Sequence, residues 1–161
     1  MAKLEQKQSI VEEIKGYVEK ATSAVLIDYR GLTVTEDTEL RKKLREAGVV
    51  YKVYKNTMLN FAFKGTAFES LAKDLQGPTA VAFGFDDATA PARMINEMAK
   101  KMPKLEFKSG VVEGNYYDKE GIKVIATIPS REVLLSRLLG SLKAPMANLA
   151  RVLKQIAEKA A

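Results

Sequence analysis

Apolar side chains near the start of the chain recur at steps of three and four residues, the spacing of one face of a helix. The apolar positions of this face are Ile10, Val11, Ile14, Tyr17, Val18 and Ala21. The spacing predicts a helix over residues 4–21. Residues 24–29 follow as a short, mostly apolar run that ends at Arg30-Gly31, and this run predicts a buried strand.

The same patterns continue through the next hundred residues. They predict a helix over 36–47 capped by Thr35 and ended by Gly48, a strand over 49–54, a helix over 58–63 capped by Asn56 or Thr57, and a helical stretch over 66–75. After the break at Gly77-Pro78 they predict a strand over 79–83, a helix over 88–102, a strand over 105–112 and a short helix capped by Asp118.

The order of these elements, β-α-β, a helical insertion and again β-α-β, predicts an α+β fold. We expect a ferredoxin-like split βαβ sheet with helices packed on one face, and extra helices at the N-terminus and after the second strand. A doubly wound parallel sheet is the alternative. In the split βαβ order, the residues that end the first strand and those that begin the second need not lie together.

A different pattern begins at Pro129-Ser130, where Ser130 can cap a long helix. Leucines and other apolar residues form a narrow stripe from Leu134 to Ile156, and Gly140 and Pro145 interrupt it. We expect these two residues to weaken or bend the helix and to act as a hinge. The predicted domains are therefore a globular domain over 1–129 and a helical arm over 130–161. The stripe either binds a partner or packs on the chain's own domain.

The residue types that are missing from the chain exclude much chemistry. The 161 residues include no Cys and no His, so there is no disulfide, no thiol nucleophile and no imidazole base or ligand. Neither a GxxxxGK[ST] loop nor a GxGxxG turn occurs, and Asp86-Asp87 is more typical of a helix cap than of a metal site. We expect no enzyme activity, no cofactor and no metal; an enzyme would need a Lys or carboxylate pocket.

Targeting signals and membrane segments are also missing from the sequence. The first residues carry no secretory signal, and no apolar run is long enough to cross a bilayer. We therefore expect a cytoplasmic protein without a membrane partner.

The net charge of +6 is concentrated in two segments. Residues 30–64 and residues 130–161 each carry a net charge of +4, and the rest of the chain is almost neutral. Basic patches attract phosphate backbones and gain affinity by releasing counterions. Ordinary solvated surface is the alternative interpretation.

The first basic segment combines cations with amide, hydroxyl and aromatic groups. A strand-end loop contains Arg30, Gly31 and Thr33, the following helix carries Arg41 and Arg45 one turn apart, and the second strand and its end contain Lys52, Lys55, Asn56 and Thr57. Arginine forks and amide donors suit phosphate oxygens, and polar loops suit the shape of a folded RNA. These nine residues are the predicted RNA-binding set.

Several segments together resemble the family of bacterial large-subunit ribosomal protein ten, the stalk-base protein. They are Tyr29-Arg30-Gly31-Leu32-Thr33, the helix with Leu40-Arg41 that ends in Glu46-Ala47-Gly48-Val49, Lys52-Val53-Tyr54-Lys55-Asn56-Thr57, Gly77-Pro78-Thr79-Ala80, Pro129-Ser130-Arg131-Glu132 and Lys143-Ala144-Pro145. Their order and spacing extend the resemblance over essentially the whole chain.

The resemblance implies a structural protein of the large subunit. It implies that the first domain binds large-subunit ribosomal RNA beside the neighbouring stalk-base protein eleven. It also implies that the C-terminal helix recruits dimers of the acidic stalk protein, which engage translational GTPases. We expect two dimers, because only 16 residues follow Pro145. The predicted contacts to the acidic dimers are Leu142, Met146, Leu149, Val152, Leu153 and Ile156.

The family also implies feedback binding of the chain to its own messenger RNA. The alternative function is a stand-alone RNA-binding translational regulator whose C-terminal helix folds back on the domain.

Overall fold

A computed structural model describes residues 2–102 and 104–160, with the side chains of residues 2–7 and 160 left out of the description. Its contacts divide the chain into two units, with the boundary between Ile128 and Pro129. In the described part of the chain, no helix is both long enough and apolar enough to cross a membrane.

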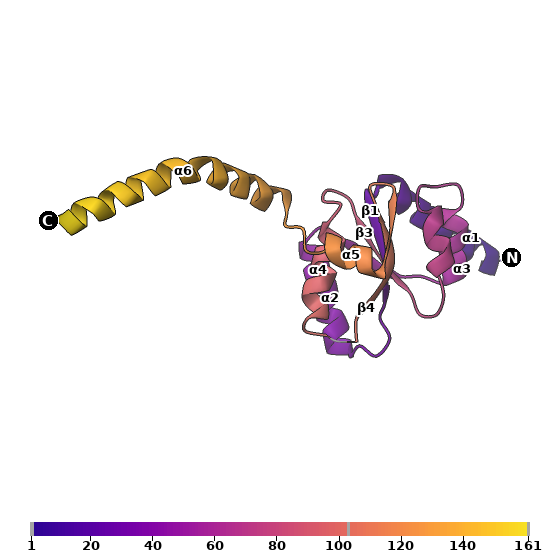
Figure 1. Ribbon diagram of the computed structural model, residues 1–161. Coiled ribbons are helices and arrows are strands. Elements are labelled where there is room, and N and C mark those ends of the chain that lie inside the picture. Colours follow the sequence, from indigo (N-terminus) through magenta and orange to yellow (C-terminus); the bar gives the residue numbers. More distant parts are fainter. Residues whose placement is uncertain (1, 103, 161) are drawn as a thin grey trace. The chain divides into compact units, whose positions relative to one another are not determined.

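The first unit alternates helices and strands in close agreement with the predicted order. Its elements are α1 (Ala2–Lys20), β1 (Ser23–Asp28), α2 (Val34–Glu46), β2 (Val50–Val53), α3 (Asn56–Phe63), the 3₁₀ helix η1 (Glu69–Asp74), β3 (Ala80–Gly84), α4 (Ala90–Ala99), β4 (Glu106–Val112), β5 (Asn115–Asp118) and α5 (Lys119–Ile125) (Figure 1). Two predicted helices are shorter than expected, since the stretch over 66–75 forms only η1 and the helix over 88–102 forms only α4.

The five strands form one sheet in the order β2-β3-β1-β4-β5, and every neighbouring pair is antiparallel. The first four strands have the split βαβ arrangement, so the α+β, ferredoxin-like prediction is confirmed and the parallel alternative is excluded. Strand β5 was not predicted. It returns along β4 through a two-residue turn in which Glu113 and Gly114 have φ values of 51° and 80°, the conformation of a tight hairpin turn.

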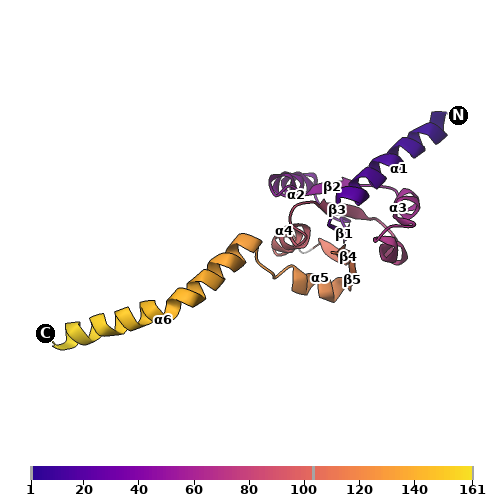
Figure 2. The same ribbon diagram turned by 90° about the horizontal axis from the view of Figure 1, so that it is seen from above.

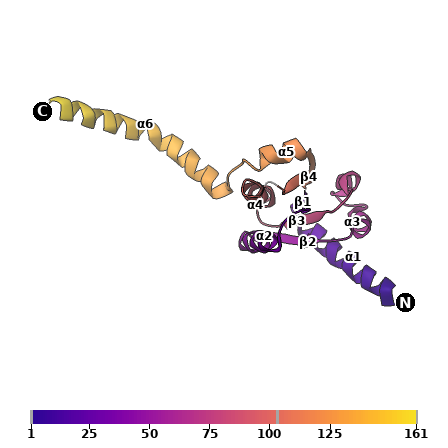
Figure 3. The ribbon, with the colours of Figure 1, turned by 90° about the horizontal axis from the view of Figure 1, so that it is seen from below.

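Helices cover both faces of the sheet. Figures 2 and 3 show α2, α4 and α5 on one face and α1 and α3 on the other. The prediction placed helices on one face and added extra helices at the N-terminus and after the second strand; in the structure these extra helices cover the second face. Side chains alternate along β1 in agreement with the two-residue period of a strand: Val25 and Ile27 belong to the first core, and Ala24 and Leu26 belong to the second.

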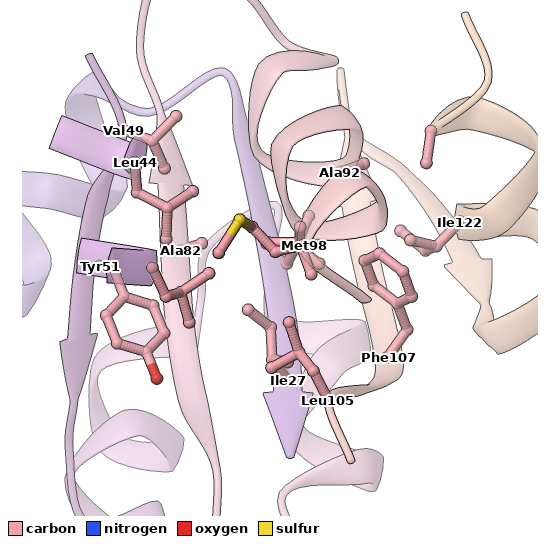
Figure 4. Packing of buried hydrophobic residues seen from close by; sticks show 14 of the residues in the cluster. Ile27, Leu44, Val49, Tyr51, Ala82, Ala92, Met98, Leu105, Phe107 and Ile122 are labelled. Atoms are coloured by element: carbon pink, nitrogen blue, oxygen red, sulfur yellow. The ribbon is translucent and has the colours of Figure 1, made fainter. Parts of the chain in front are cut away.

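The core between the sheet and the helices α2, α4 and α5 is filled by apolar side chains from every layer. Figure 4 shows Ile27, Ala82 and Phe107 of the sheet facing Met98 of α4, with Leu44 of α2 beside them. All five side chains are buried. Met98 and Met102 are buried in this core and Met94 packs against it, so these flexible side chains fill space between α4 and the sheet.

Asp118 occupies the predicted cap position of α5, without a side-chain hydrogen bond, but the predicted caps of α2 and α3 differ from the observed ones. Thr33, not Thr35, caps α2: its hydroxyl accepts a hydrogen bond from the Glu36 amide, and the Glu36 carboxylate accepts one from the Thr33 amide. This reciprocal pair is a capping box. Lys55 occupies the cap position of α3 without a side-chain bond. Neither Asn56 nor Thr57 caps this helix, because the helix already begins at Asn56.

The second unit consists of one helix, α6 (Arg131–Ala160), which continues through Gly140 and Pro145 (Figure 1). Neither residue ends the helix in this structure. Every described side chain of α6 is exposed except that of Ala144, which is half-buried. The unit therefore has no core of its own.

Candidate RNA interface and exposed helical arm

The sheet topology brings the two predicted RNA-binding loops to the same edge. Strands β1 and β2 both run antiparallel to β3, so they run parallel to each other and end at the same edge of the sheet, where β3 begins. Residues 29–33, 54–57 and 77–79 therefore gather there, and we call them the sheet-edge surface. The sequence had left open whether these loops meet.

A hollow of about 340 Å³ lies in this surface. Its lining combines aromatic, cationic, amide and backbone groups from residues far apart in the sequence: Tyr29, Val53, Tyr54, Lys55, Asn56, Thr57, Gly77, Pro78 and Thr79. Lys55 and Thr57 are exposed there, and Asn56 is half-buried. An open hollow with several donors and a cation suits an extended polar ligand better than an enclosed small molecule.

The 77–79 loop is fixed to the elements on either side of it. The Asn56 side-chain amide donates a hydrogen bond of 2.8 Å to the Gly77 carbonyl. The Lys108 ammonium of β4 donates bonds of 2.6 Å to the carbonyls of Gln76 and Pro78 and one of 2.7 Å to the Thr79 hydroxyl. Sequence reasoning missed Lys108, because its acceptors are about 30 residues away and no local pattern connects them.

Burial of Lys108 lowers the pKa of its ammonium group. Lys108 donates hydrogen bonds to three acceptors of the loop and thereby holds the sheet-edge surface in place. Direct contacts to a ligand would come from other cations.

Arg30 and Gly31 form the tip of the loop after β1. The Arg30 side chain is exposed, and its backbone amide donates a 2.9 Å hydrogen bond to the Asp28 carboxylate. Gly31 has a φ of +87°, and a Cβ there would lie 3.2 Å from the Lys104 side chain. Because only glycine adopts this conformation readily, Gly31 sets the direction of the loop that presents Arg30.

Thr33 has a structural role at the start of α2. Its hydroxyl and amide both take part in the capping box of α2, and these bonds lower the pKa of Glu36. Any contact from Thr33 to RNA would compete with that role.

Lys52 lies away from the sheet edge, on the face that α1 covers. Its ammonium forms an ion pair with Glu13, donates a 3.3 Å hydrogen bond to the Tyr17 hydroxyl and lies 5.1 Å from the centre of the Tyr17 ring. The hydrogen bond to Glu13 raises the pKa of Lys52, and the bond to Lys52 lowers the pKa of Glu13. The charge of Lys52 is thus already balanced within the fold.

Arg41 and Arg45 lie on α2, on the other face of the sheet. Arg41 forms a 2.7 Å ion pair with Asp37, and its guanidinium lies 5.1 Å from the centre of the Tyr51 ring. Burial raises the pKa of that tyrosine to about 12. Arg45 is exposed, and no ion pair of the described residues includes it. Of the nine predicted residues, six therefore belong to the sheet-edge surface, two to α2 and one to the face beneath α1.

The predicted partner-binding residues on α6 are all strongly exposed. Their exposed fractions range from 50% for Val152 to 70% for Met146. The cations of this helix have few internal partners, a 3.7 Å ion pair between Lys154 and Glu158 among them. A Cβ added at Gly140 would meet no atom within 4 Å, so packing does not require glycine there.

The carboxylate pair at Asp86-Asp87 has a structural role. The Asp87 carboxylate accepts hydrogen bonds from the amide and hydroxyl of Thr89 at the start of α4 and pairs with Arg93 at 3.1 Å. Among the described residues, no group of acidic side chains is arranged to hold a metal ion.

Two protein families match segments of the chain. Residues 2–100 match the family described as ribosomal protein L10, and residues 128–161 match the ribosomal protein uL10 C-terminal region. The chain is 53% identical to the large ribosomal subunit protein uL10 of Alkaliphilus metalliredigens, over 97% of this chain and 94% of that protein. It is 52% identical to the protein of the same name from Clostridium tetani, over 95% and 89%.

A third relative, the large ribosomal subunit protein uL10 of Clostridioides difficile, is 50% identical over 98% of this chain and 94% of that protein. The similarity covers both structural units and nearly the full length of each relative. The chain therefore belongs to the ribosomal protein L10 family and is a structural, non-enzymatic protein of the large ribosomal subunit.

Proposed function

We propose that this chain forms the base of the ribosomal stalk, with its first unit bound to large-subunit ribosomal RNA and its second unit bound to acidic stalk protein dimers. The observation that carries the proposal is a contrast between the two units. The first unit has two cores and a polar sheet edge, whereas the apolar stripe of α6 is exposed along its whole length. As part of the ribosome the protein acts in the cytoplasm.

The RNA half of the proposal rests on the sheet-edge surface. Arg30 and Lys55 are exposed cations on two loops that the topology joins, and Asn56 and Thr57 add amide and hydroxyl groups beside them. Cations contact phosphates, and polar loops follow the irregular shape of a folded RNA. The proposal also includes Gly31, which shapes the 29–33 loop, and Arg41 and Arg45 of α2, which lie outside the sheet-edge surface. Thr33 and Lys52 contribute only if RNA replaces their internal partners.

The partner half rests on α6. A contiguous exposed apolar stripe is unfavourable in water and marks a protein interface, and side chains at i, i+3, i+4 and i+7 are read by a helix-in-groove partner. Covering Leu149, Leu153 and Ile156 is worth roughly 1.5–3 kcal/mol each before ordering costs. The net charge of +4 over residues 130–161 favours an acidic partner.

The proposed stoichiometry is two acidic dimers for each chain. Ala144-Pro145 divides the stripe into one block over 134–142 and another over 146–156, each about three turns long. Pro145 lacks an amide proton, so α6 can bend between the two blocks, and the weak helix propensity of Gly140 allows a further bend near the end of the first block. Native mass spectrometry of the complex is expected to give four acidic copies per chain; six copies would contradict the proposal.

Copurification of the full chain and of a chain without residues 144–161 tests both halves together. Each is mixed with large-subunit ribosomal RNA, protein eleven and the acidic stalk protein. The shortened chain keeps only the first block of the stripe, so we expect it to lose at least half of its acidic protein and to keep its RNA and protein eleven. A stand-alone regulator predicts a different pattern, in which both chains bind RNA and neither binds the acidic protein.

A further inference from the structure

A second hollow of about 770 Å³ lies between α1 and α3, which pack directly against each other. The α1 residues Val11 and Lys15 line one side, and Lys55, Met58 and Phe61 line the other. Figure 3 shows these two helices side by side on their face of the sheet. Of the residues that line this groove, only Lys55 and Thr57 belong to the predicted RNA-binding set.

Phe61 is the unexplained residue of the groove. Helix α3 is anchored by the buried side chains of Leu59, Ala62 and Phe63, whereas Phe61 is 63% exposed. The Lys64 ammonium lies 5.5 Å from the centre of its ring. Because most of its surface is exposed, the Phe61 ring adds little to the core, and a large apolar side chain in such a place is available to a ligand.

Three lysines lie in or beside this groove. Lys15 and Lys55 line the groove, Lys64 stands by Phe61, and Glu12 is the one acidic side chain among the lining residues. Lys55 and Thr57 belong both to this groove and to the sheet-edge hollow. The two hollows are thus adjacent parts of one surface.

We propose that the groove receives an unpaired base of the bound RNA, stacked on the Phe61 ring, with Lys15 and Lys55 contacting the flanking phosphates. This inference rests on the proposed RNA-binding function and adds a site to it. Exposed aromatic rings between cations are the usual platform for unpaired bases, since every base has a face that can stack. A protein helix would instead need a longer row of apolar contacts than Val11, Met58 and Phe61 provide.

The test uses the fragment of large-subunit ribosomal RNA that the wild-type chain protects from nuclease. Phe61→Leu keeps an apolar side chain and removes the aromatic face, so we expect RNA binding about tenfold weaker with an unchanged salt dependence, because no phosphate contact is lost. Phe61→Tyr keeps the ring and is expected to bind within about twofold of wild type. Ultraviolet cross-linking is expected to join the RNA to Phe61.

Val124→Ala is the matched control, because Val124 is an exposed apolar residue on α5, across the sheet from α3. We expect this variant to bind RNA like wild type and all variants to melt at the wild-type temperature.

Wild-type RNA affinity for Phe61→Leu would overturn the stacking proposal and would favour a protein occupant. If Lys55→Ala still lowers the salt dependence in that case, the proposed RNA-binding function survives without the base site. If the wild-type chain binds no ribosomal RNA, both proposals fail.

Discussion

Apolar residues are buried in the first unit of this protein and exposed in the second. In the first unit, aliphatic and aromatic side chains fill two cores, one on each face of the sheet. In the second, leucines of equal size lie exposed along a single helix. The difference shows that apolar residues support the fold only where a second layer covers them. Where none does, they are available to a partner.

The largest expected effect is on the free energy of unfolding, when the same Leu→Ala substitution is made once in each unit. Leu26 is fully buried in the sheet and Leu149 is 62% exposed on α6. We expect Leu26→Ala to lower the free energy of unfolding of the first unit by about 2–5 kcal/mol, from lost burial and the cavity left behind. Leu149→Ala should change it by less than about 0.5 kcal/mol. Chemical denaturation followed by circular dichroism and tyrosine fluorescence measures both.

An equal loss of stability for both variants would contradict the comparison, because it would mean that α6 contributes to the core of the first unit.

The next effect concerns the arm and its partner. Leu153→Ala removes an exposed apolar side chain from the middle of the second block of the stripe, and we expect acidic-protein binding to weaken about tenfold. Lys154→Ala, its charged neighbour, should weaken binding less than Leu153→Ala does, because an exposed ion pair is worth little. Isothermal titration of the acidic protein into each variant gives the comparison. If Lys154→Ala has the larger effect, charge and not the apolar stripe governs recruitment.

A third effect concerns the sheet-edge surface. Arg30→Ala and Lys55→Ala each remove one exposed cation, and we expect the slope of log affinity for RNA against log salt concentration to fall by about one unit for each lost phosphate contact. Lys42→Ala on α2 is the control, an exposed cation outside the predicted set. Unchanged slopes for both test variants would refute the assigned RNA surface.

The smallest effect tests whether Thr33 serves the fold. Thr33→Ala removes the cap of α2, and we expect the free energy of unfolding to fall by about 1 kcal/mol. Hydrogen bonds from Thr33 lower the pKa of Glu36 below its ordinary value of 4.5. That stabilisation is therefore present above pH 4.5 and is lost as the pH falls through the lowered pKa. Thr33→Ala should weaken this acid-dependent loss; denaturation at pH 3 and pH 7 measures it.

Local sequence patterns predicted most elements of the first unit, and two features that were missed also have a local signal. Thr33 and Glu36 have the spacing of a capping box, whereas Thr35 lacks an acidic or amide residue three positions later. The Glu113-Gly114 pair before β5 is likewise compatible with a tight hairpin turn. These two features were predictable from the residues alone.

Features that depend on distant contacts were not predictable. Lys52 pairs with Glu13, 39 residues away, and Lys108 braces a loop about 30 residues away. No local spacing distinguishes these partnered lysines from the exposed Lys55. The convergence of the two RNA loops also required the order of the strands, because both loops reach one edge only when β1 and β2 flank β3. Topology therefore decides which cations of the sequence form one surface.

The central claim is that each unit binds its own partner, and one cross-measurement tests it most directly. Lys55→Ala and a Leu149→Asp variant are each titrated with the protected ribosomal RNA fragment and with the acidic stalk protein. The account predicts that Lys55→Ala weakens only RNA binding and that Leu149→Asp weakens only acidic-protein binding. A loss of both affinities in either variant would contradict it.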